Sequence, residues 1–427
     1  MNLIQQKINL IKSNSFYQKY CADELHRNSF FLMGSTGVMA VVGFLFWIIA
    51  SRFYSPAAIG IGGSFVSLTN LLQGIASLGL PITLIRFLPR SQKPDLKISS
   101  AITVTGFSSL IISILFYFIS KAWLPEIHNL ISNPLMWSVF AICVILGTWQ
   151  QIENSIFIAY NRAHWIFIES IVYSILKVIL VLPLAFLQGF GIFISQAGSL
   201  ALAAIVSLTV HIQKYKINFF QGIHGNVIHE LGKYTAVSYL VGLTNGVPAQ
   251  ILPAMIAGSL GPDSAAHFFL ALMMVNLITI VPQASSQTLF ATASANPQLM
   301  RSLTIKSLKT QVVLVLIAFT GLWIFGGWIL FVFGSTYAAD TTPVLRILSF
   351  SVFPILVAAP LNTRLRVRKE LKKLAIITVL GAASVITSCF IGSKYGLNGV
   401  AYGYVFGQII VCLLILTEWR LFKHRTL

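Results

Sequence analysis

Three side chains that can ionise or form hydrogen bonds stand one helical turn apart inside a long apolar stretch: Glu169, Tyr173 and Lys177. A four-residue spacing places them along one face of a helix. A charge in an apolar environment is costly unless it faces protein or water. Two interpretations of Lys177 stay open: it meets an anionic ligand inside a charged cavity, or it forms a structural ion pair with Glu169 or with Glu153 of the preceding stretch.

Polar residues also mark three other apolar stretches. Asn70, Gln73 and Ser77 share one helical face, and a second such face carries Asn276, Thr279, Gln283 and Gln287. A third stretch contains Asn245, Gly246, Pro248, Gln250 and Pro253, which predicts an interrupted helix there. Polar groups and freed backbone at membrane depth indicate protein or a water-filled cavity rather than lipid. Helix–helix hydrogen bonding is the alternative, and we favour the cavity.

Three arginines complete the candidate cavity residues: Arg52, Arg86 and Arg346. Each has a simpler interpretation. Arg346 lies a few residues into a predicted span, from which its long side chain can reach the lipid headgroups. Arg86 follows Pro81 in a cationic cluster, and Arg52 can anchor the membrane interface. Glu153 and Glu169 are candidates for ion pairing or for ion coupling.

Catalytic signatures are missing from the sequence. It contains no GxxxxGKS or GxxxxGKT phosphate loop, no HExxH and no GxSxG. The longest loop on the predicted non-cytoplasmic side, 121–134, holds Glu126 and His128, which we interpret as solvated. The four cysteines have no paired spacing. We therefore expect no enzyme activity, no cofactor and no metal.

The composition is that of an all-α, polytopic membrane protein. Of the 427 residues, 56% are hydrophobic and 9% are charged, and the mean hydropathy is +0.82. A typical soluble domain has about 25% charged residues. The net charge of +18 could suggest a nucleic-acid partner, but the basic residues form short clusters between apolar runs, so we exclude nucleic acid.

The apolar runs predict about twelve spans, because a helix needs about 20 residues to cross a hydrocarbon core of about 30 Å. We place them near 29–50, 59–81, 99–120, 135–158, 166–187, 192–212, 234–257, 264–290, 310–333, 342–361, 374–392 and 397–419. Before them, residues 1–20 carry apolar positions at helical spacing. They predict either a short amphipathic helix on the membrane surface or a solvated terminus.

The distribution of Lys and Arg residues predicts how these spans are oriented in the membrane. Nearly all of the 29 Lys and Arg residues fall on the side that carries both termini. The exceptions are Arg52, Lys121 and Lys394 on the other side, with Lys177 and Arg346 inside spans. Because cytoplasmic loops carry the excess of Lys and Arg, both termini are predicted to be cytoplasmic.

Matching landmarks suggest two halves of the same topology. Small residues recur every four positions in the sixth span and again in the twelfth (Gly191, Ser195, Ser199 and Ala203; Gly399, Gly403 and Gly407), a spacing that lets helices approach closely. The turn at Ser55–Pro56 has a counterpart at Gly261–Pro262. An even number of spans in each half makes the repeat parallel. We predict an N-terminal lobe at 1–212, a cytoplasmic linker at 213–233 and a C-terminal lobe at 234–427.

Three short motifs carry a resemblance: SRFYSP at 51–56, LIRFLP at 84–89 and GLNGVAYGYVFGQ at 396–408. With the span pattern, they make the chain similar to the Wzx-like polysaccharide flippases of the multidrug/oligosaccharidyl-lipid/polysaccharide exporter superfamily. The resemblance implies two six-helix lobes in a V-shaped bundle, with spans 1, 2, 7 and 8 lining a central cavity. It also implies alternating access. One departure is that 245–253, NGVPAQILP, has no charge, which argues against a simple charge-pair gating scheme.

The cargo that the resemblance implies is an undecaprenyl-diphosphate-linked oligosaccharide, moved across a bacterial cytoplasmic membrane for surface polysaccharide assembly. Its partners would be membrane lipids, a polysaccharide polymerase and glycosyltransferases. Three alternatives stay open. A multidrug/cation antiporter often has an acid in its first span, and 29–50 has none. A major-facilitator transporter usually has a GxxxDRxGRR-like loop, unlike LPRSQKPDLK at 88–97. A polytopic glycosyltransferase usually needs larger outer loops.

Overall fold

The computed structural model describes residues 24–214, 225–295, 300–368 and 370–423. Within these ranges the chain forms helices and no strand, which confirms the all-α prediction. The segment 1–20, predicted to be amphipathic, lies outside the described residues. So do residues 215–224 of the predicted linker, while the part of that linker after Gly225 belongs to a helix.

Eleven of the described helices are long and apolar enough to cross a membrane, and a bent pair, α14 and α15, makes a twelfth span. This agrees with the predicted number. The helices that form the spans are α3 (Glu24–Phe53), α4 (Pro56–Ala76), α6 (Pro94–Trp123), α8 (Pro134–Ala159), α9 (Ala163–Val181), α10 (Gln188–Thr209), α11 (Gly225–Leu260), α12 (Pro262–Ala295), α13 (Met300–Phe333), α14 (Ser335–Ser349), α15 (Val352–Val367), α16 (Leu371–Ser393) and α17 (Gly396–Lys423). Two shorter helices are α5 (Leu80–Phe87) and α7 (Pro125–Ile131).

Local sequence explains where several helices begin. Ser55 precedes α4, and its Oγ accepts a hydrogen bond from the Ala58 N–H at 3.2 Å. Asn133 precedes α8, and its Oδ1 accepts from the Leu135 N–H at 2.9 Å. A proline follows each of these caps, at the helical position where a missing N–H costs nothing. Such caps satisfy N–H groups that have no partner within the helix.

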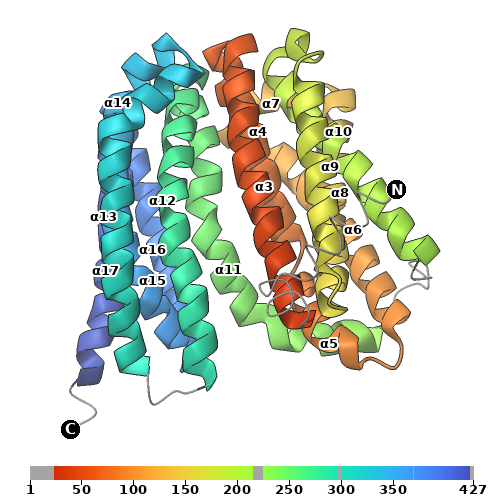
Figure 1. Cartoon of the computed structure of the whole chain (residues 1–427). Helices are drawn as coiled ribbons and strands as arrows, with labels where there is room; N and C mark the ends of the chain where they lie inside the picture. Colours follow the sequence, from red (N-terminus) through yellow and green to blue (C-terminus); the bar gives the residue numbers. More distant parts are fainter. Residues whose placement is uncertain (1–23, 215–224, 296–299, 369, 424–427) are drawn as a thin grey trace, which may run out of the picture.

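The helices form two bundles, and Figure 1 shows them side by side. The first half comprises α3 to α10, and the second half comprises α11 to α17. Each half has its own apolar core, centred on Phe65 and Phe140 in the first and on Phe268 and Leu348 in the second. The halves meet where α4 packs along α11 and α12. By contrast, α3 packs along α9 and has little contact with α4.

The prediction that 245–253 interrupts a helix is wrong. Helix α11 runs without a break and contains Pro248 and Pro253. In Figure 1, α11 curves from the second half toward the first as it descends. A proline removes one N–H and bends a helix, and neighbouring helices can satisfy the backbone groups that it frees. The two prolines therefore shape this span rather than ending it.

Two other spans do break. Helix α4 ends at Ala76, earlier than the predicted span, because Leu78 and Gly79 adopt left-handed backbone angles with φ of 50° and 71°. The chain then continues in α5, which packs on α8. The second break lies between α14 and α15, which are bent by 40°. Each break turns the chain within a bundle.

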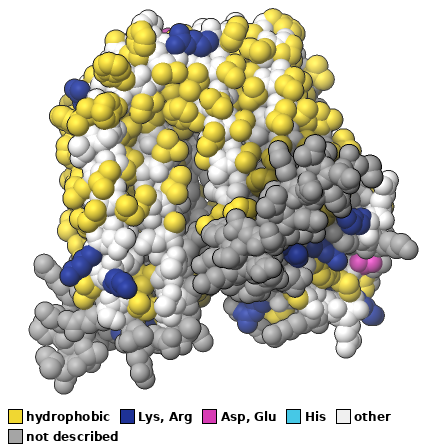
Figure 2. All heavy atoms as spheres, in the orientation of Figure 1, with side chains coloured by type: hydrophobic (Ala, Val, Ile, Leu, Met, Phe, Trp, Pro, Cys, Tyr) yellow, Lys and Arg dark blue, Asp and Glu magenta, His cyan; other side chains and the backbone are white. Residues whose placement is uncertain are grey.

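The two ends of the molecule differ. At the end where α3 begins and α17 ends, here called the basic end, the cationic segments 86–97 and 364–373 connect helices. The opposite end is here called the closed end. Figure 2 shows a broad band of apolar side chains on one face, with Lys and Arg near its edges. This pattern is that of a protein that spans a membrane.

At the closed end, a shared apolar cluster joins the halves. It includes Trp47 and Ile59 from the first half and Ala266 and Phe333 from the second. We call this cluster the seal. Contacts between the halves surround it: Arg52 donates hydrogen bonds from Nε and Nη2 to the Val332 carbonyl at 3.0 and 2.6 Å.

Candidate functional site

A central cleft of about 1060 Å³ lies between the two halves. Helices α3 and α4 line it from the first half, and α11, α12, α15 and α17 line it from the second. Its volume lies at the upper limit of ordinary ligand pockets, about 300–1000 Å³. The cleft can therefore hold a ligand larger than a typical small molecule.

The two sides of the cleft differ in chemistry. The first half supplies mainly apolar groups, among them Met39, Phe44 and Trp47. The second half supplies most of the hydrogen-bonding side chains: Gln250, Asn276, Thr279, Gln283, Gln287, Asn362, Arg366 and Gln408. Amides both donate and accept hydrogen bonds, and a guanidinium binds phosphate or carboxylate oxygens in pairs. This side of the cleft is suited to a ligand that combines hydroxyl groups with an anion.

The cleft extends toward the basic end and stops at the seal. Arg366 and Phe290, which line it, lie in the last turns of α15 and α12. At the other limit, the rings of Trp47 and Phe269 meet with their centroids 4.6 Å apart. Trp47 belongs to the seal, and Phe269 packs against it. In the same region, a methyl group on Gly60 would overlap the Pro262 carbonyl oxygen. Among the described residues, the cleft is therefore closed at this end by the seal.

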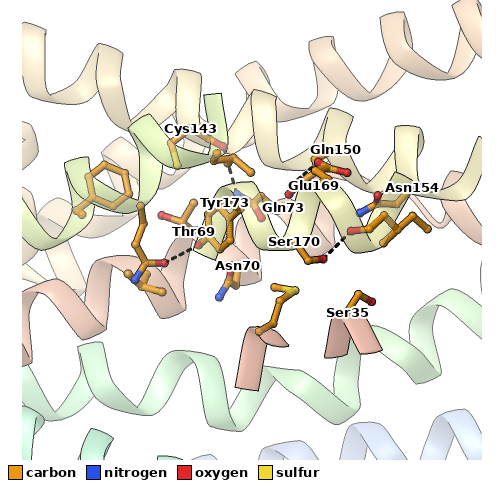
Figure 3. Close-up of a pocket in the computed structure, with 16 residues that line it drawn as sticks. Ser35, Thr69, Asn70, Gln73, Cys143, Gln150, Asn154, Glu169, Ser170 and Tyr173 are labelled. Carbon is orange, nitrogen blue, oxygen red and sulfur yellow. Dashed lines mark hydrogen bonds between the residues drawn. The ribbon is translucent and has the colours of Figure 1, made fainter. Parts of the chain in front are cut away.

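A second cavity, of about 200 Å³, lies within the first half among α3, α4, α8, α9 and α10. We call it the side cavity. Figure 3 shows Asn70, Gln73, Gln150, Asn154 and Glu169 around it. The Gln150 Nε2 donates to the Glu169 Oε1 at 2.7 Å, and the Gln73 Nε2 donates to the Cys143 carbonyl at 3.2 Å. Glu169 is 3% exposed, and its Oε2 has no hydrogen-bond partner in the structure.

Lys177 is buried on α9, one turn beyond Tyr173. Its Nζ lies 5.0 Å from the centroid of the Tyr173 ring and 5.4 Å from that of Phe46, which are cation–π distances. Across the described part of the chain, no carboxylate forms an ion pair with it. The structural ion pair with Glu153 or Glu169 is therefore not formed in this conformation.

The Lys177 ammonium approaches the central cleft at Gly43. Gly43 lines the cleft from α3, and the Nζ lies 3.8 Å from the position that a Cβ at this residue would take. Because residue 43 has no side chain, the cation lies close behind the surface of the cleft. An anion in the cleft would thus be stabilised by a charge that has no carboxylate partner among the described residues.

Several candidates lie away from both cavities. Arg52 binds carbonyls at the end of α13, Arg86 lies beside the Phe87 ring, and Arg346 lies over the Trp323 ring at 5.0 Å. All three are exposed, and none lines the central cleft or the side cavity. Glu153 is buried in α8 and likewise lines neither cavity. The three arginines thus lie outside both cavities in this conformation, and their simpler interpretations stay open, because span position does not define which way a side chain points.

The polar faces divide between the two cavities. The face on α12 lines the central cleft, together with Gly246 and Gln250 of α11. The side chain of Asn245 lies outside the described residues. Asn70 and Gln73 of α4 line the side cavity instead.

Sequence reasoning overlooked Arg366 because it belongs to a cationic cluster that the positive-inside rule already explains. One signal was available: Ala358, Asn362 and Arg366 are spaced four residues apart, as on one helical face. Three further amides of the side cavity were not among the candidates: Gln150 and Asn154, which lie four residues apart on one face of α8, and Gln196 of α10.

The helices, their two-bundle packing and the cleft define a multi-pass membrane protein with a transporter architecture. The family model described as "Polysaccharide biosynthesis protein" matches residues 25–292. The chain belongs to this family, as the sequence motifs predicted. A comparison with curated proteins finds no match.

Solved structures share the fold. An inward-facing multidrug resistance MATE family transporter of the MOP superfamily matches with a TM-score of 0.71 and 15% identity, over 90% of this chain and 94% of its own. The lipid II flippase MurJ in an inward closed conformation matches with a TM-score of 0.69 and 16% identity, over 92% and 87%. An outward-facing MATE family transporter matches with a TM-score of 0.61 and 16% identity, over 93% and 94%. At these identities the likeness shows the fold alone.

Proposed function

We propose that the protein is a flippase that moves an undecaprenyl-diphosphate-linked oligosaccharide across the bacterial cytoplasmic membrane for surface polysaccharide assembly. The observation that supports this most is the central cleft, with a side rich in amides and an arginine, closed at one end. Membership of the polysaccharide biosynthesis family supports the substrate class. Amides bind sugar hydroxyl groups, and Arg366 and Lys177 attract the diphosphate.

In this proposal the basic end faces the cytoplasm, so the cleft receives the substrate from the inner leaflet. The seal then opens while the basic ends of the two halves approach each other. Binding can favour this change only if the substrate has a higher affinity for the second state. Of the two candidate glutamates, Glu153, which lies outside the side cavity, is the proposed group for coupling to an ion. A polymerase and glycosyltransferases are the proposed partners.

The similarity to MATE family transporters supports a second candidate, a multidrug/cation antiporter. The cargo of a multidrug/cation antiporter is usually cationic. Among the described residues that line the central cleft, however, the charged side chain is that of Arg366, which is positive. This observation favours an anionic cargo.

Deletion of the gene in its source bacterium separates the candidates. If the protein is a flippase, its loss leaves lipid-linked intermediates trapped on the cytoplasmic side and reduces surface polysaccharide. If it is a glycosyltransferase, its loss leaves no such intermediates. Unchanged glycans with altered drug sensitivity indicate an antiporter and contradict the proposal.

Arg366→Gln should reduce transport of the lipid-linked glycan in proteoliposomes by about tenfold or more. A hydrogen bond to a charged group contributes about 1.5–3 kcal/mol, and 1.4 kcal/mol is about tenfold in a binding constant. Arg368→Gln is the matched control, since Arg368 lies in the same cationic segment but does not line the cleft. Equal transport by the two variants would exclude Arg366 from the anion site.

A further inference from the structure

The side cavity has the chemistry of a small polar binding site. Its volume of about 200 Å³ is below the range of about 300–1000 Å³ for drug-sized ligands. It therefore accommodates a small group, or one part of a larger ligand. Glu169 and Tyr173 line it together with five amides: Asn70, Gln73, Gln150, Asn154 and Gln196.

Two acceptor oxygens of this cavity have no partner. They are the Glu169 Oε2 and the Asn154 Oδ1, both inaccessible to solvent and without a hydrogen bond in the structure. Leaving such a group unsatisfied costs free energy. Two neighbouring oxygens do have partners: Glu169 Oε1 accepts from the Gln150 Nε2, and the Gln196 Oε1 accepts from the Tyr173 hydroxyl at 3.1 Å. Both side chains line the cavity, so a donor group that enters it can pair with these oxygens once the side chains rotate toward it.

The side cavity adjoins the central cleft. Met39 of α3 lines both, and its side chain is 46% exposed. Because α3 packs along α9 and has little contact with α4, the seam between α3 and α4 is not closed by helix packing. Asn70, exposed on α4, lies at this seam. A ligand group in the cleft can reach the side cavity beside Met39.

We propose that the side cavity is a subsite for one neutral sugar residue, a hexose or an N-acetylhexosamine, of the transported glycan. Hydroxyl groups supply the donors that Glu169 and Asn154 lack, and the rings of Tyr173 and Phe193 supply apolar contact. An acidic sugar is excluded, because its carboxylate would bring further acceptor oxygens against Glu169. The proposal rests on the proposed function, and it assigns to this cavity the selection of the sugar.

Saturation-transfer NMR on the purified protein tests the subsite directly. The probes are free N-acetylglucosamine, galactose and glucuronic acid at millimolar concentration. We expect signals from the two neutral sugars and none from glucuronic acid. Asn154→Leu should reduce the neutral-sugar signal at least tenfold, and Gln196→Met should also reduce it. Gln151→Leu is the matched control, because Gln151 lies on the same helix and does not line the cavity.

Transport of the lipid-linked glycan by the same variants in proteoliposomes separates this proposal from the proposed function. Loss of transport in Asn154→Leu but not in Gln151→Leu supports the subsite. If Asn154→Leu and Gln196→Met transport at the wild-type rate, and the wild type gives no NMR signal from the free sugars, the subsite is overturned and the proposed flippase function still stands. No transport by the wild type, with the NMR pattern retained, overturns the flippase instead. Displacement of the sugar signal by sodium ions would show a cation site and overturn the subsite.

Discussion

Lys177→Met should abolish transport while leaving the protein at least as stable as the wild type. Lys177 is 6% exposed, and its ammonium has no carboxylate partner in the described chain. A charge at the centre of a bilayer-spanning helix costs about 2.5–3.5 kcal/mol, so an apolar side chain of similar length should raise the melting temperature. Transport should fall at least a hundredfold, because the anion in the cleft loses its nearest buried cation. Thermal unfolding and proteoliposome transport measure the two effects.

A second substitution tests the route from Lys177 to the cleft. Gly43→Leu places a side chain where the Nζ approaches the cleft within 3.8 Å of the Cβ position, so transport should fall although Lys177 is intact. Gly37→Leu, on the same helix with no atom within 4 Å of its Cβ position, should transport normally. Lower stability of Lys177→Met would indicate a structural role. Full transport by that variant would remove Lys177 from the site.

The fold was predictable from the sequence because the bilayer limits the possible structures. Lipid cannot satisfy backbone hydrogen bonds, so each long apolar run must be a helix. The predictions that were wrong concern local backbone geometry. Leu78 ends α4 early through a backbone angle that its residue type does not suggest. Pro248 and Pro253 lie within one continuous helix, because a membrane helix tolerates proline where its surroundings satisfy the freed backbone groups, and no local pattern reveals those surroundings.

The site was predictable only where several polar residues share a face, as on α12. A stripe shows that a helix has a polar side, but it does not show which neighbour that side meets. Gln73 therefore belongs to the side cavity, while Gln283 belongs to the central cleft. Arg52 illustrates the same limit: its partner is the carbonyl of Val332, 280 positions along the chain.

Gly60→Val should open the seal. Gly60 lies in the second turn of α4, so close to the start of α12 that a Cβ would overlap the Pro262 carbonyl and meet the Ala266 backbone nitrogen. Backbone cannot move aside as a flexible side chain can, so the two halves must separate. Overpacking costs about 1–3 kcal/mol, which disfavours the closed state by about 5- to 150-fold, since 1.4 kcal/mol is tenfold. Transport should fall because one of the two states no longer forms.

Labelling of a single cysteine at position 269 measures this opening. Phe269 lines the cleft beneath the seal and contacts Trp47. In a background without other cysteines, a membrane-impermeant maleimide added at the closed end should react about tenfold faster in Gly60→Val than in the parent. Gly321→Val is the matched control, because it adds the same side chain to α13 where no atom lies within 4 Å. Equal labelling of the two variants would show that the close approach of α4 and α12 does not hold the seal, and that the Arg52 hydrogen bonds and the apolar cluster are sufficient.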